Sequence, residues 1–218
     1  MKKLVVTFLS VFAIVLAIAC TSESDSTETV PTTDKPVVAV ARVGQTAPAF
    51  TLTSATGQKH ALADFKGKYI VLEWVNYDCP FVKKHYNSGN MQNLQKKYAD
   101  NGVVWLSICS SAPGKQGHFE GQTLLDRIAA EKSNAAAYLI DADGTVGKMY
   151  AAKTTPHMYV IDPKGNLVYA GAIDDKPSTS TADLVGAENY VVAALDAALS
   201  GTEISTRSTT SYGCSVKY

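Results

Sequence analysis

The sequence predicts a three-layer α/β sandwich, in which a mixed central β-sheet lies between helices on both faces. Short, almost wholly apolar runs of strand length alternate with segments whose apolar residues recur every three or four positions. That alternation favours parallel strands joined by helical crossovers. Near the C-terminal end, two strand-like runs flank a tight turn and predict an antiparallel hairpin, so the sheet is expected to be mixed.

The first elements of the body are expected to be two strands and two helices. Residues 50–53 alternate apolar and polar side chains and predict a strand, whereas the apolar run 69–75 predicts a strand buried on both faces. A helix is expected to begin at Pro80, because proline suits the first helical position. A second helix presents one face of apolar residues spaced three and four apart, namely Met91, Leu94 and Tyr98.

Two further strands are expected to flank a helix in the middle of the body. The apolar runs 103–109 and 138–140 predict the strands, and residues 121–132 predict the helix. The inward face of that helix is expected to carry Leu124, Leu125 and Ile128. Residues 141–153 are expected to be partly helical.

A hairpin and a last helix complete the predicted body. Strands 157–161 and 167–172 flank the turn 162–166, whose proline, glycine and asparagine favour chain reversal. The helix is expected over 187–199, where it buries an apolar stripe of Val191, Ala194, Leu195, Ala198 and Leu199.

The composition is that of an ordinary globular protein. The chain has 218 residues, 46% of them apolar and 18% charged, which leaves room for one domain with short extensions. Twenty Lys and Arg residues balance twenty Asp and Glu residues. No basic surface is therefore apparent, and nucleic acid is not expected as a partner.

Residues 1–20 have the features of an export signal, with two lysines, an apolar run and a cysteine at its end. The apolar run is shorter than the roughly 20 residues that cross a bilayer as a helix. Its end resembles a bacterial lipoprotein signal, which implies that Cys20 is lipidated and becomes the new N-terminus. Ordinary secretion with cleavage near Ala19 is the alternative, and both place the domain outside the cytoplasm, on the periplasmic side of a bacterial membrane.

The remaining chain divides into a tether, a body and a tail. Residues 21–36 are rich in Ser, Thr and acidic residues and predict a flexible tether. The body spans 37–201, and a polar tail, 202–218, contains Cys214. Without the signal the chain has 18 basic and 20 acidic side chains and a net charge of −2. Membrane attachment is therefore expected only through lipid on Cys20.

Cys79 is the residue from which chemistry is expected. A thiol is a nucleophile only as the thiolate, and an ordinary cysteine has a pKa near ~8.5. Cys79 follows a predicted buried strand and precedes Pro80, so its sulfur should lie at a helix N-terminus, where unpaired amides and the helix dipole favour an anion. Lys83, Lys84 and His85 would add to that effect if they face back. A buried, inert cysteine is the alternative.

Several segments in order along the chain resemble the thioredoxin superfamily, and within it the redoxin branch of alkyl hydroperoxide reductase and thiol-specific antioxidant proteins. The matching segments are 44–52 (GQTAPAFTL), 62–68 (LADFKGK), 73–82 (EWVNYDCPFV) and 154–162 (TTPHMYVID). The resemblance extends from about Val43 to Leu199 and implies a thioredoxin-like fold and redox activity at the CPFV loop.

The resemblance also implies roles for individual residues. Cys79 is the attacking thiol, and Pro156 is cis and packs beside it. Thr155 presents its backbone to an extended substrate chain. The other residues expected to contact substrate are Pro80, Phe81 and His157, the last as a polar wall of the groove.

Glu73, six residues before Cys79, matches a buried acid that handles the proton of the released thiol in thioredoxins. A carboxyl group in an apolar strand should have a raised pKa, which suits proton transfer near neutral pH. A Glu at an exposed strand edge is the alternative.

The second thiol is not fixed by the sequence. A CxxC pair would need cysteine at position 82, where this chain has Val82. Cys214 in the tail is the preferred partner of Cys79, Cys109 at the end of a neighbouring strand is the alternative, and Cys214 without a redox partner is a third possibility.

The first functional hypothesis is an extracytoplasmic thiol-disulfide oxidoreductase, in which Cys79 attacks a disulfide and a second thiol resolves the mixed disulfide. The substrate would be a disulfide-bearing protein, a small thiol or disulfide, or a hydroperoxide, with an unidentified reductant. A peroxiredoxin-like peroxidase ranks second, because Asn76 and Leu72 replace the usual Thr and Pro and Arg127 is expected to face away.

Two weaker alternatives are a copper-binding assembly protein on the same fold and a binding module without catalysis. Copper(I) favours thiolates and histidine, but carriers of this fold usually have two cysteines on the loop. No phosphate-binding loop is present either. We therefore expect neither a metal nor another cofactor.

Overall fold

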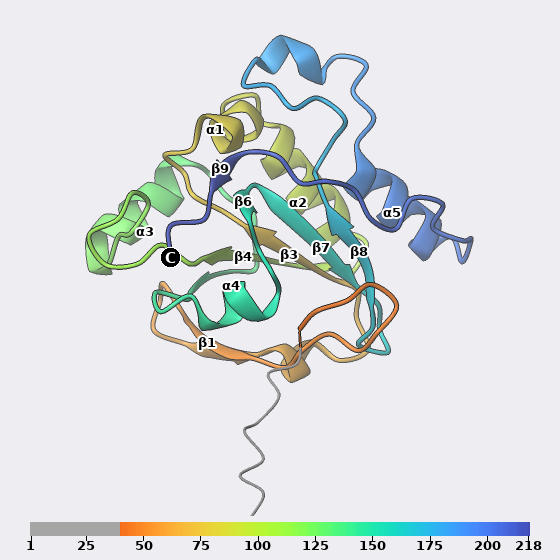
Figure 1. Cartoon of the computed structure of the whole chain (residues 1–218), viewed down its shortest axis with the longest axis horizontal. Coiled ribbons are helices and arrows are strands. Elements are labelled where there is room, and N and C mark those ends of the chain that lie inside the picture. The colour runs from red at the N-terminus through yellow and green to blue at the C-terminus, as the bar shows by residue number, and fades with distance from the viewer. Residues whose placement is uncertain (1–39) are drawn as a thin grey trace, which may run out of the picture. The chain divides into compact units, whose positions relative to one another are not determined.

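A mixed sheet of seven strands runs through residues 40–218, the part of the chain that the computed structural model describes (Figure 1). The predicted signal, Cys20 and the tether 21–36 lie outside these residues. Strand order is β2-β1-β5-β4-β3-β7-β8. The strands are β1 (Thr51–Ser54), β2 (Lys59–Ala61), β3 (Ile70–Trp74), β4 (Val104–Cys109), β5 (Ala137–Ile140), β7 (His157–Ile161) and β8 (Leu167–Gly171).

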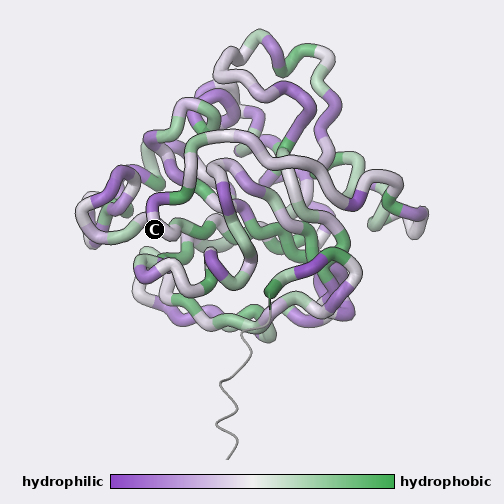
Figure 2. Tube along the Cα trace, in the orientation of Figure 1, coloured by the Kyte–Doolittle hydropathy of each residue, from purple (hydrophilic) through white to green (hydrophobic). Residues whose placement is uncertain are grey.

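The sheet is mixed, as the sequence predicts. Strands β3, β4 and β5 are parallel neighbours, whereas β1 pairs antiparallel with β5 and β7 pairs antiparallel with β3. The hairpin of β7 and β8 forms one edge. Every residue of β3 and β4 is buried, because these strands lie between two packed layers. Much of the trace through the middle of the domain accordingly has the green of hydrophobic residues (Figure 2).

Helices cover both faces of the sheet, but unequally. Four helices pack on one face, and the second face is covered by one short helix, α4 (Thr145–Met149), a 3-10 turn (Leu62–Phe65) and the segment that leads into β1. The four helices are α1 (Pro80–Asn87), α2 (Asn90–Ala99), α3 (Gly121–Ala130) and α5 (Tyr190–Leu199). A second 3-10 turn spans Thr181–Leu184.

Two details of the helices differ from the prediction. The last helix begins at Tyr190, because Asn189 caps it and its side chain accepts a hydrogen bond from the Val192 amide at 3.0 Å. The prediction that Leu199 is buried is wrong: its side chain is 41% exposed at the end of the helix. In α3, Leu124 is buried and Leu125 and Ile128 are half-buried.

The C-terminal tail returns across the domain (dark blue in Figure 1). It runs beside β8, where the Ala170 amide donates to the Arg207 carbonyl, and then forms β9 (Cys214–Ser215) against β6 (Thr154–Thr155). Tyr218 then donates from its hydroxyl to the Ala152 carbonyl at 2.8 Å. Across residues 40–218, the helices all fall short of the length and hydropathy that a membrane span requires.

Candidate active site

Cys79 caps the N-terminus of α1, directly after the loop that leaves β3. Its backbone is extended, Pro80 occupies the first helical position, and its side chain is 0% exposed. The Cys79 carbonyl accepts from the Lys83 amide at 2.9 Å, while the amide of Val82 points at the sulfur. The apolar strand, the cysteine and the proline therefore place the sulfur at the unpaired amides of a helix start.

Thr155 is the principal neighbour of this thiol. The Cys79 Sγ donates to the Thr155 carbonyl oxygen at 3.1 Å. The Thr155–Pro156 peptide bond is cis, as the family resemblance implies. The buried Thr155 hydroxyl has no hydrogen-bond partner among residues 40–218, and it is one of the groups that lower the pKa of Cys79.

Cys214 is brought to the same place by the tail. In the ladder of β6 and β9, Cys214 lies directly opposite Thr155, and its side chain is among the groups that lower the pKa of Cys79. Both cysteines are free thiols in this structure, Cys79 buried and Cys214 half-buried. The structure thus joins two residues that are 135 positions apart, and it does so through a strand of only two residues.

The two thiols differ in acidity. Burial acts to raise the pKa of Cys79, but hydrogen bonds from Cys214, Thr155 and the Val82 amide outweigh it, and the pKa falls below its ordinary value. Burial and the adjacent Cys79 raise the pKa of Cys214. Within this pair, ionisation is therefore favoured at Cys79 over Cys214.

Cys109, the alternative second thiol, is buried elsewhere. It ends β4, and its Sγ donates to the Gly117 carbonyl oxygen at 3.5 Å, with no hydrogen bond to Cys79 among the residues described. Of the two candidates, Cys214 is therefore the one that the described contacts bring to Cys79.

Glu73 is buried in the sheet, not exposed at its edge. Its carboxylate accepts hydrogen bonds from four side chains on α1, α2 and β4, namely Tyr86, Gln95, Trp105 and Ser107. Burial raises the pKa of Glu73, and these hydrogen bonds oppose the rise. No described hydrogen bond joins Glu73 to either thiol, so its contacts tie β3 to the neighbouring elements.

His157 does not form a wall of the thiol site. It lies on β7 opposite Trp74, and its Nδ1 contacts the Tyr159 hydroxyl at 3.1 Å on the second face of the sheet. Burial lowers the pKa of His157 to about 4. Its side chain borders a separate cavity of about 430 Å³ beside the tail residues 208–211.

Of the other expected contact residues, Pro80 is exposed and Phe81 packs against Tyr212, with ring centroids 5.9 Å apart.

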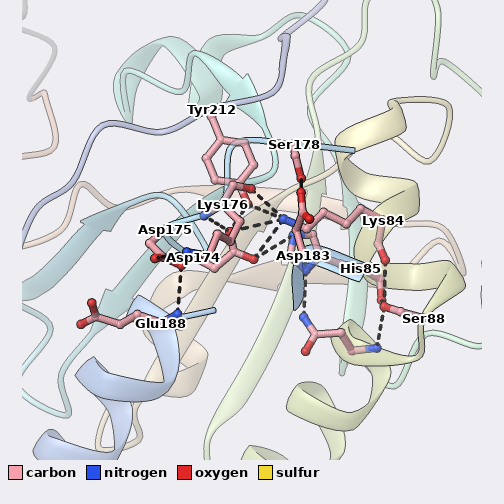
Figure 3. Close-up of polar contacts among 11 residues, drawn as sticks. Lys84, His85, Ser88, Asp174, Asp175, Lys176, Ser178, Asp183, Glu188 and Tyr212 are labelled. Carbon is pink, nitrogen blue, oxygen red and sulfur yellow. Dashed lines mark hydrogen bonds and ion pairs between the residues drawn. The ribbon is translucent and has the colours of Figure 1, made fainter. Parts of the chain in front are cut away.

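Lys84 and His85 do not face Cys79 either. Both are buried on α1 beside Asp174: Lys84 Nζ lies 3.3 Å from Asp174 Oδ2, and His85 Nε2 lies 3.8 Å from it (Figure 3). Burial lowers the pKa of His85 to about 4, so this imidazole is neutral near pH 7. Neither side chain is among the groups that lower the pKa of Cys79.

The expectation that Arg127 faces away is also wrong. Its guanidinium pairs with Asp78, the residue before Cys79, at 2.5 Å. The neighbouring Asn76 side chain accepts from the Asp78 amide at 2.9 Å and donates to the Gln116 carbonyl at 3.3 Å. The loop that carries Cys79 is thus held from two sides.

No pattern in the sequence indicates that Asp174 and Tyr212 lie beside Lys84. Asp174 and Tyr212 lie in segments without helical or strand periodicity. Only the aromatic ring of Tyr212 indicates that this residue packs against the domain. Within residues 40–218, no three His, Cys, Asp or Glu side chains converge as metal ligands would.

Comparisons with known proteins identify the family to which this chain is similar. Residues 43–170, more than half of the chain, match the AhpC/TSA family. The thioredoxin-like protein YneN of Bacillus subtilis is 28% identical over 143 residues, which cover 65% of this chain and 79% of that protein. The thiol-disulfide oxidoreductase ResA of Bacillus thuringiensis is 25% identical over 126 residues, 58% of this chain and 67% of that protein.

A solved structure extends the similarity beyond the matched segment. An uncharacterised conserved protein from Geobacillus kaustophilus superposes with a TM-score of 0.70 at 28% identity, over 81% of this chain and 92% of that protein. The α/β fold with its mixed central sheet is thus thioredoxin-like.

Proposed function

Because the chain belongs to the AhpC/TSA family, we propose that Cys79 is the nucleophile of a thiol-disulfide exchange and that Cys214 resolves the mixed disulfide. The observation that carries this proposal is the placement of both thiols at Thr155, with the pKa of Cys79 lowered and that of Cys214 raised.

The first step uses the Cys79 thiolate. It attacks one sulfur of a substrate disulfide, the substrate S–S bond breaks, and a Cys79–substrate disulfide forms. The departing substrate sulfur leaves as a thiolate and takes up a proton from solvent. The amides at the start of α1 and the Thr155 hydroxyl stabilise the attacking anion before this step.

The second step uses Cys214. Its thiol loses a proton, the resulting thiolate attacks the Cys79 sulfur, and the second substrate thiol is released. Two electrons have then passed from the protein to the substrate, and a Cys79–Cys214 disulfide remains. A dithiol reductant is needed to return the protein to its starting state.

A hydroperoxidase is the second candidate, and one observation favours it. The Arg127 guanidinium pairs with Asp78, the residue before Cys79, so a cation able to stabilise the negative charge on a reacting peroxide lies next to the Cys79 loop. In that reaction Cys79 would attack the peroxide, release an alcohol or water and become a sulfenic acid, which Cys214 would condense with.

One set of assays separates the two candidates. Reduction of a model disulfide and consumption of hydrogen peroxide are measured with wild type, Cys79→Ser and, as a matched control, Cys109→Ser. The proposal expects disulfide reduction that Cys79→Ser abolishes and Cys109→Ser preserves. Peroxide turnover much faster than disulfide reduction would overturn it in favour of the second candidate.

We also propose that the domain acts on the outer side of a bacterial membrane. The N-terminal apolar segment ending in Cys20 supports this location, and the −2 charge of the processed chain leaves lipid as the attachment. Labelling cells with a radioactive fatty acid tests it: wild type should carry label and Cys20→Ser should not.

A further inference from the structure

A buried ion pair lies beneath the tail, one helical turn beyond the thiol site. Lys84 and Asp174 have side chains that are 0% and 1% exposed, and the Lys84 ammonium also donates to the Lys176 carbonyl at 2.7 Å. A buried ion pair is costly unless its remaining hydrogen-bonding groups are also satisfied. The proposed function above does not use this pair.

Tyr212 completes the pair from the tail. Its hydroxyl donates to Asp174 Oδ1, and its ring lies 5.5 Å from the Lys84 ammonium (Figure 3). Figure 3 shows the three side chains converging from α1, from the loop after β8 and from the tail. We call Lys84, Asp174 and Tyr212 the clasp.

The clasp is linked to the thiols by one residue. Gly213 separates Tyr212 from Cys214, and a Cβ at Gly213 would lie 2.1 Å from the Thr155 carbonyl oxygen, the acceptor of the Cys79 thiol. The tail is therefore held on one side by the clasp and on the other by the β6–β9 ladder. That ladder occupies the Thr155 backbone, to which an extended substrate would otherwise pair.

We propose that Tyr212 is a positioning residue, and that the clasp holds Cys214 over Cys79 and must open to admit a disulfide substrate. This inference rests on the proposed function. It follows that the clasp has two effects of opposite sign. Closure raises the effective concentration of Cys214 at the Cys79 sulfur, and it lowers the access of outside molecules to the same sulfur.

Tyr212→Phe tests the proposal, because it removes the hydroxyl and keeps the ring against Phe81. Tyr190→Phe is the matched control: Tyr190 is also half-buried, and its hydroxyl has no hydrogen bond among the described residues. Access is measured as the rate at which a polyethylene-glycol maleimide labels the Cys79 peptide of the reduced protein. Formation of the Cys79–Cys214 disulfide is measured as the fraction of protein that carries it in glutathione buffers with a known ratio of reduced to oxidised glutathione.

In Tyr212→Phe we expect the labelling rate to be about fivefold higher and the equilibrium constant for the Cys79–Cys214 disulfide to be lower by a similar factor. A change of this size corresponds to the loss of one hydrogen bond. Tyr190→Phe should match wild type in both. If the labelling rate and the equilibrium constant are both unchanged in Tyr212→Phe, or if both decrease, the proposal is overturned. Absence of any Cys79–Cys214 disulfide in wild type would instead overturn the proposed function, so the two failures are distinguishable.

Discussion

Thr155 and Cys214 lie opposite each other in the ladder of β6 and β9, while the Thr155 carbonyl oxygen accepts the hydrogen bond of the Cys79 thiol. One residue thus touches the buried Cys79 and aligns the strand that brings the second thiol. Val82 stands where a CxxC motif has its second cysteine, and the resolving thiol that we propose instead comes from the C-terminal tail. The following predictions depend on that geometry.

Cys214→Ser should stop the reaction after its first step. The Cys79 thiolate still attacks a disulfide, but no thiol remains beside it to release the substrate. With a dansylated peptide disulfide, the variant should accumulate a stable adduct at Cys79 and turn over at least tenfold more slowly. Cys109→Ser should resemble wild type, and turnover retained in Cys214→Ser would contradict the assignment.

Thr155→Val should make Cys79 less acidic. Valine keeps the branched shape and the backbone carbonyl, but it lacks the hydroxyl, which is one of the groups that lower the pKa of Cys79. The pKa of Cys79 should therefore rise, and the rate of iodoacetamide alkylation at pH 7 should fall. A plot of that rate against pH gives the pKa directly. An inflection at the wild-type pH would show that the hydroxyl has no part in it.

Gly213→Ala should separate the two thiols. Gly213 has φ +134°, where other residues are strained, and an added Cβ would meet the Thr155 carbonyl. We expect the equilibrium constant for the Cys79–Cys214 disulfide to fall at least tenfold. Gly201→Ala is the matched control, since Gly201 has φ +73° but nothing within 4 Å of the added Cβ. Equal effects of both variants would attribute the loss to backbone strain alone.

Glu73→Gln should change how stability depends on pH. Burial raises the pKa of Glu73 above its ordinary value of 4.5, so the folded state favours the protonated carboxyl. The stability that this group contributes is complete below pH 4.5 and is lost as the pH rises through the raised value. The free energy of unfolding of Glu73→Gln minus that of wild type should thus increase with pH above 4.5.

Denaturant titrations of both proteins between about pH 4 and pH 8 measure this difference. Only the slope is predicted, because glutamine also alters the hydrogen bonds from Trp105 and Tyr86. A difference that stays constant over this range would contradict a raised pKa.

The fold and the position of Cys79 at the start of a helix could be predicted because local rules determine them. Apolar runs of strand length identified β3 and β4, and Pro80 after Cys79 marked the start of α1. The mixed central sheet and the cis peptide bond at Pro156 agree with the family resemblance. The export signal stays a prediction, since residues 1–39 are outside the described chain.

The orientation of several side chains could not be predicted without the register of the sheet. His157 follows Pro156 directly, but strand residues alternate between faces, so Met158 and Val160 face the core of Cys79 and His157 faces the other core. Lys84 and His85 similarly face a loop carboxylate, Asp174, that no periodic pattern marks. A contact between segments 90 residues apart depends on the tertiary fold alone.

The most direct test is peptide mapping of the oxidised full-length protein under non-reducing conditions. The account predicts a disulfide-linked pair of peptides that contain Cys79 and Cys214, with Cys109 recovered as a free thiol. A Cys79–Cys109 disulfide, or Cys79 recovered unpaired while the protein reduces a model disulfide, would contradict it.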